Sequence, residues 1–123
     1  MKNRSIKLFL NDIIEAIRRI QEYTKNISSD DFKKNNLVID AVIRNLEIIG
    51  EASTHIPENI RNLYSELPWS SIVGLKNIAI HKYFKIDLDI IWNILIKDIP
   101  EAKETISIML NNLNSQNNQN RID

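Results

Sequence analysis

Apolar residues recur every three or four positions along most of the chain, a spacing typical of amphipathic α-helices. Only two glycines and three prolines interrupt this pattern, and no segment convincingly predicts a β-strand. One face of the first predicted helix, over about residues 3–25, carries Ile6, Leu10, Ile13, Ile17 and Ile20. The pattern therefore predicts an all-α fold.

Capping and proline signals divide the rest of the chain into further helices. Ser and Asp side chains at residues 28–31 suit the start of a second long helix, which is predicted to end near Pro57. Pro57 and Pro68 suit first turns, because proline lacks only an N–H group that a first turn leaves unpaired. The remaining helices are expected over about residues 57–64, 68–81, 87–99 and 100–113. Two long helices joined by a short turn indicate an antiparallel hairpin within a bundle of five to six helices.

The chain of 123 residues has the length of one domain. Residues 112–123 are polar and low in complexity, so we expect a disordered tail there, after a helical domain over residues 1–111. No segment approaches the roughly 18 apolar residues of a membrane span. Asn11 and Asp12 interrupt the apolar start too early for a signal peptide, so a cytoplasmic location is predicted.

Composition limits the chemistry. Lys plus Arg and Asp plus Glu number 16 each, so the chain lacks the overall positive field of a protein that coats nucleic acid, and any nucleic-acid contact must be local. Because there is no cysteine, disulfides, thiolate metal sites and cysteine nucleophiles are excluded. Phosphate-binding glycine loops and serine nucleophile elbows are also absent.

One cluster gathers reactive side chains within eight residues: Lys76, Asn77, His81 and Tyr83. On a continuous α-helix, Asn77 and His81 would lie about 40° apart, but Lys76 and His81 would diverge by about 140°. Either the helix ends near His81 and turns the imidazole back, or a second copy of the chain completes the site across a two-fold axis. In the simpler interpretation, His81 is a helix-end histidine bonded to a carbonyl, the lysine is solvated and Tyr83 fills an interface.

The second long helix holds further polar candidates. Glu51 and His55 could supply two metal ligands, but a histidine at a helix C-terminus is favourable in itself, and no further ligand completes a set. Arg44 and Glu51 share one face and are candidates for lining a cleft or a dimer interface, although an internal charge pair would explain them equally well.

Two longer blocks resemble a known family. The segment from Trp69 to Glu101, WSSIVGLKNIAIHKYFKIDLDIIWNILIKDIPE, is similar to the motif region of HEPN domains of the HepT-like branch. The segment from Ala41 to Ser53, AVIRNLEIIGEAS, resembles the second helix of that branch. The family signature is an arginine followed four to six residues later by a histidine, typically Arg-Asn-x-x-x-His, with a tyrosine two residues beyond. The matching positions here are Lys76, Asn77, His81 and Tyr83.

The resemblance implies a homodimeric HEPN-type bundle and a metal-independent endoribonuclease without a cofactor, the toxin of a type VII toxin–antitoxin system. Its substrate would be RNA, with tRNA as one candidate. The implied partner is a minimal nucleotidyltransferase antitoxin of the MntA type, which silences the toxin by AMPylation of Tyr83. His81 would act as general base or acid, and Lys76, aided by Asn77, would stabilise charge on the phosphate.

The chain departs from the family pattern at the cation. Lys76 stands where the signature has arginine, and lysine keeps the charge while losing the planar two-pronged grip on phosphate. Lys82 and Lys85 could add to a local basic patch. The alternative function is therefore a catalytically weak or inactive HEPN module that binds a nucleotidyltransferase or a nucleotide. A purely structural helical dimer is a third hypothesis.

Overall fold

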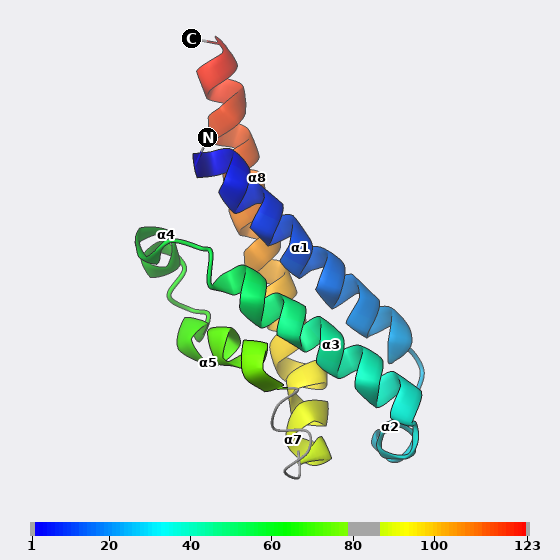
Figure 1. Cartoon of the computed structure of the whole chain (residues 1–123). Helices are drawn as coiled ribbons and strands as arrows, with labels where there is room; N and C mark the ends of the chain where they lie inside the picture. The colour runs from blue at the N-terminus through cyan, green and yellow to red at the C-terminus, as the bar shows by residue number, and fades with distance from the viewer. Residues whose placement is uncertain (1, 79–86, 123) are drawn as a thin grey trace.

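The computed structural model describes residues 2–122 except 79–86, with side-chain surroundings for residues 5–78 and 87–115. The described parts are helical and contain no strand, which confirms the all-α prediction (Figure 1). The elements are α1 (Lys2–Tyr23), α2 (Ser29–Lys34), α3 (Asn36–Ser53), α4 (Glu58–Leu63), α5 (Trp69–Gly74), the 3₁₀ turn η1 (Leu75–Asn77), α7 (Leu88–Asn93), the π turn η3 (Ile94–Asp98) and α8 (Ile99–Ile122). No described helix is both long and apolar enough to cross a membrane.

The core lies where α1, α3 and α8 pack together. Helices α1 and α3 run antiparallel side by side, and α8 crosses behind them (Figure 1). The predicted apolar face of α1 is buried as expected, and α3 contributes a matching row. The apolar side chains buried most completely in α1 and α3 are Leu10, Ile13, Ile17, Ile20, Val42 and Leu46. The predicted antiparallel hairpin is thus present, with apolar side chains filling the space between its helices.

The single long second helix of the prediction is wrong, because the chain breaks at Asn35 into α2 and α3. Asn35 leaves the helical region with φ −110° and ψ 94°, and its side chain accepts a hydrogen bond of 3.1 Å from the Val38 amide. Ser28 and Asp31 cap α2 reciprocally, with the Asp31 amide donating to Ser28 Oγ at 3.0 Å. An internal asparagine can cap a new helix as readily as it can continue one, which the apolar spacing alone does not reveal.

Pro100 does not separate two helices as predicted. The amide of Ile99 bonds to the Ile94 carbonyl across the wider π turn η3, and the helix continues as α8. Proline has no N–H for the Ile96 carbonyl, and its ring would crowd that carbonyl in an α-helix. The π turn directly before Pro100 relieves this conflict without ending the helix.

The start of the predicted tail contacts the helical body. Helix α8 continues to Ile122, although the sequence predicts a disordered segment from residue 112. Asn112 Nδ2 donates to Tyr64 Oη at 2.7 Å, and Leu113 is only 8% exposed. Asn112 and Leu113 therefore pack with the domain, and the disordered tail stays a prediction for the residues that follow.

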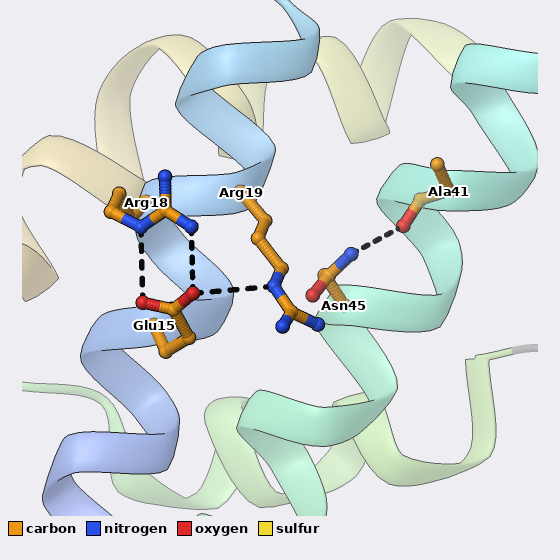
Figure 2. Close-up of polar contacts among 5 residues, drawn as sticks. All are labelled: Glu15, Arg18, Arg19, Ala41 and Asn45. Carbon is orange, nitrogen blue, oxygen red and sulfur yellow. Dashed lines mark hydrogen bonds and ion pairs between the residues drawn. The ribbon is translucent and has the colours of Figure 1, made fainter.

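The charged side chains of Glu15, Arg18 and Arg19 lie on the solvent-exposed side of α1 (Figure 2). Glu15 accepts hydrogen bonds from Arg18 at 2.7 and 3.0 Å, and the Arg19 guanidinium lies 3.4 Å from the same carboxylate. The hydrogen bonds from Arg18 lower the pKa of Glu15 to about 2, with Arg19 adding to the effect. Inside the α1–α3 pair, Asn45 Nδ2 donates to the Ala41 carbonyl at 2.8 Å within α3, whereas the buried Asn45 Oδ1 accepts no hydrogen bond from the described residues.

Candidate functional site

Lys76 and Asn77 lie on η1, directly after α5. The predicted fourth helix is α-helical to Gly74 and then tightens into the 3₁₀ turn, whose Leu75 carbonyl accepts from the Ile78 amide. Ile78 is α-helical again. Both Lys76 and Asn77 are exposed. A 3₁₀ turn advances about 120° per residue instead of about 100°, so the angles deduced for a continuous α-helix do not apply across this site.

His81 and Tyr83 lie outside the described residues, as do Lys82 and Lys85. The structure therefore gives the positions of two members of the sequence-predicted cluster, Lys76 and Asn77. Their roles with His81 stay a prediction.

Trp69 anchors the start of the segment that carries Lys76 and Asn77. Its indole Nε1 donates to the Tyr64 carbonyl at 3.0 Å, and only 8% of the residue is exposed. The Arg61 guanidinium lies 5.9 Å from the centre of the Trp69 ring and donates to the Ser53 carbonyl at 2.7 Å. Arg61 thus joins the C-terminal end of α3 to the first turn of α5.

Helix α3 supports the end of the segment that carries Lys76 and Asn77, because α5 and η1 both pack against α3 (Figure 1). The predicted accessory residues Arg44 and Glu51 lie on α3, and both are exposed. Glu51 is not paired with Arg44; its carboxylate lies 3.7 Å from His55 Nε2. The internal Arg44–Glu51 charge pair is therefore absent, and the two residues stay candidates for a cleft or an interface.

His55 packs as a ring at the end of α3. Its imidazole stacks on Phe9 of α1, with ring centroids 4.3 Å apart and an interplanar angle of 11°. Across the described ranges, no three His, Asp or Glu side chains are grouped so that they could hold a metal ion. Stacking on Phe9 and proximity to Glu51 explain the position of His55.

A groove of about 720 Å³ runs between α5 and the η3–α8 segment. Leu75 lines it, but Lys76 and Asn77 do not. Most of its apolar lining comes from core helices, and four exposed carboxylates border it: Glu66, Asp98, Glu101 and Glu104. The exposed Lys97 lies at the same border, so the carboxylates outnumber the lysine and the border is acidic on balance.

A family model described as ribonuclease HepT-like matches residues 13–109. This chain belongs to the HepT-like family. "Putative RNase MJ1380" of Methanocaldococcus jannaschii is 44% identical over 109 residues, which cover 89% of this chain and all of that protein. "Probable ribonuclease HepT" of Thermococcus cleftensis is 43% identical over 100 residues, covering 81% of this chain and 91% of that relative. No solved structure matches the chain.

Family membership places the chain among ribonuclease-type enzymes, and the matched stretch includes α3, η1 and the whole predicted cluster. Sequence reasoning missed Arg61 and Trp69, which join α3 to the start of α5, and Gly50, where a Cβ would meet the backbone of Leu75 and Lys76. Gly50 gave a readable signal, because a glycine inside an apolar helical pattern usually has a packing reason. The Arg61–Trp69 contact joins separate elements and leaves no sequence signal.

Proposed function

We propose that this HepT-like protein is the toxin of a type VII toxin–antitoxin pair, an endoribonuclease that cleaves RNA in the cytoplasm without a metal ion. One observation carries the proposal. Lys76 and Asn77 are exposed together on η1, inside the stretch matched by the ribonuclease family and at the signature spacing from His81. tRNA is one candidate substrate.

The residue types suit cleavage through the ribose 2′-hydroxyl. His81 takes the proton of this hydroxyl or protonates the leaving 5′-oxygen, while the 2′-oxygen attacks phosphorus and the P–O5′ bond breaks. The products are a 2′,3′-cyclic phosphate and a free 5′-hydroxyl. The Lys76 ammonium stabilises the negative charge that develops on the phosphate oxygens, and the Asn77 amide donates to one of them.

A homodimer is the proposed working form. In it, the Lys76 and Asn77 pairs of two copies border one RNA-binding cleft, which doubles the local positive charge of an otherwise neutral chain. Arg44 and Glu51 are exposed on the helix that supports η1, and they are the candidates for the surface near the two-fold axis.

The proposed antitoxin is a minimal nucleotidyltransferase that acts on Tyr83. The phenolic oxygen attacks the α-phosphorus of ATP, pyrophosphate leaves, and AMP stays attached to the ring. Because Tyr83 is two residues from His81, the added phosphate brings negative charge and bulk close to the site. RNA would then be excluded by repulsion and by lack of space.

Lys76 favours a second candidate function, a HEPN module that binds a nucleotidyltransferase or a nucleotide but cleaves poorly. Lysine is a point charge and does not provide the two parallel N–H donors of arginine. The variant Lys76→Arg separates the two functions. It should leave the RNase activity of a working toxin within about tenfold, whereas cleavage seen only in the variant would establish the module.

Induced expression in a bacterial host tests the proposed function. The wild type should stop growth and degrade cellular RNA, while His81→Ala should do neither. Tyr83→Phe should remain toxic and should no longer be neutralised by a co-expressed nucleotidyltransferase. Equal growth of the wild-type and His81→Ala strains, with intact RNA in both, would overturn the toxin proposal.

A further inference from the structure

Gly50 occupies a buried position in the last turn of α3, between the core residues Ile49 and Ala52. Glycine weakens the interior of a helix relative to alanine, because it loses more backbone freedom on folding. Its presence at a buried position therefore calls for a packing reason.

The reason is a backbone contact with the motif segment. A Cβ atom built on Gly50 would lie 2.3 Å from the Lys76 amide nitrogen, 2.8 Å from the Leu75 carbonyl carbon and 3.0 Å from the Ile72 carbonyl oxygen. All three atoms belong to the backbone, so no side-chain rotation can make room. An ordinary contact begins near 3.4 Å, so η1 would have to move by about 1 Å to admit even a methyl group.

Gly74, the other glycine of the chain, provides a matched contrast. It has a helical φ of −59° and is exposed, and a Cβ there would meet no atom within 4 Å. Gly74 lies two residues before Lys76, yet no contact with the described residues requires it to be glycine. The space restriction is specific to the contact at Gly50.

We propose that Gly50 is a positioning residue of the ribonuclease site. It lets α3 and η1 approach until their backbones touch, and so fixes where Lys76 and Asn77 are presented. The atom with which a Cβ at this position would clash most severely is the amide nitrogen of Lys76 itself. The inference rests on the proposed function, in which Lys76 and Asn77 contact the phosphate, and displacements of about 1 Å can lower a catalytic rate about 100-fold.

Three purified variants test this role: Gly50→Ala, Gly74→Ala and Ile20→Val. Ile20 is buried in α1, so Ile20→Val reduces stability without touching η1. Each protein is assayed for cleavage of bulk tRNA and for its urea midpoint, at a temperature where all are folded. Gly50→Ala should lower kcat by about 10- to 100-fold, with a smaller change in KM. Gly74→Ala and Ile20→Val should stay within about twofold of wild type.

The backbone amide resonances of Lys76 and Asn77 provide a readout that does not depend on RNA cleavage. Gly50→Ala should shift both resonances, and Ile20→Val should leave them in place. If Gly50→Ala is too unstable to purify, the comparison is made in the Gly74→Ala background, because alanine at an open helical position restricts the unfolded chain and stabilises the fold.

The outcomes separate the two proposals. A wild type that cleaves no RNA would contradict the ribonuclease function, and the amide resonances would still decide the contact at Gly50. Wild-type kcat and unshifted resonances in Gly50→Ala would overturn the positioning role. A loss of kcat in Gly50→Ala that Ile20→Val matches at equal urea midpoint would overturn it as well, since reduced stability would then explain the loss.

Discussion

Helix α3 meets its two neighbours in different ways. It packs against α1 across the core, to which it contributes large side chains, including Val42 and Leu46, that are fully buried. Toward η1 it presents Gly50, and there the two backbones approach with no side chain between them. One helix thus combines a conventional core contact with a backbone contact beneath the candidate site.

The two contacts should respond differently to substitution. A core of interdigitated side chains can repack around a change, at a cost in stability that depends on the cavity left behind. A backbone contact cannot repack, because its geometry is set by the helices themselves. We therefore expect changes on the α1 side to alter stability and changes on the η1 side to alter activity.

The largest expected effect on stability is that of Leu46→Ala. Leu46 is fully buried in α3, so truncation should lower the free energy of unfolding by about 2–5 kcal/mol. Urea denaturation measures this change. The protein that remains folded should still cleave RNA, because the contact with η1 is intact. Leu37→Ala provides the control on the same helix, since Leu37 is 84% exposed and its loss should cost less than about 0.5 kcal/mol.

Trp69→Phe tests the anchor at the start of α5. The change removes the hydrogen bond to the Tyr64 carbonyl and should cost about 0.5–1.5 kcal/mol in unfolding free energy. It should also reduce RNA cleavage, because α5 leads into η1. Trp92→Phe, on α7, is the matched control and should leave cleavage unchanged. Equal cleavage by both variants would show that the start of α5 does not position the site.

Ser28→Ala removes a helix cap far along the chain from η1. Ser28 caps α2 reciprocally with Asp31, and its loss should cost about 1 kcal/mol by thermal or urea unfolding. RNA cleavage should not change. Ser29→Ala, one residue further on, should cost less, and the idea of a capped α2 fails if the two variants are equally destabilised.

Glu15→Gln should have the smallest effect, because the Glu15 and Arg18 side chains are largely exposed. The folded protein holds the pKa of Glu15 at about 2, below the usual value of 4.5. A lowered carboxyl pKa contributes stability that is present above about pH 4.5 and is lost as the pH falls toward 2. The small difference between wild type and variant should therefore shrink over this range, as denaturation at several pH values would reveal. A difference that grows as the pH falls would contradict the assignment.

The contrast between the two sides of α3 also explains which features of the fold could be predicted from the sequence. The apolar face of α1 follows from side-chain spacing, because large apolar residues at helical intervals must be buried somewhere. The break at Asn35 could not be read this way, since asparagine inside an apolar pattern suits both a helix and a cap. The continuation of the helix through Pro100 could not be predicted either, because it depends on the π turn before the proline.

The residues of the candidate site could be predicted from the sequence, but the contacts that support them could not. Lys76 and Asn77 could be named from the spacing of the motif, and the structure places both on an exposed turn. The 3₁₀ winding at Leu75 arises where α5 and η1 pack against α3, a tertiary contact that local propensity does not contain. Gly50 has no side chain to indicate its neighbour, so only the fold reveals what it approaches.

The most direct test of the central claim is cleavage of tRNA by purified wild type and His81→Ala in the presence of a metal chelator, with the product ends identified by mass spectrometry. The account predicts 2′,3′-cyclic phosphate and 5′-hydroxyl ends from the wild type. His81→Ala should cleave about 10²- to 10⁴-fold more slowly. Equal cleavage by the two proteins, or wild-type cleavage that the chelator abolishes, would contradict it.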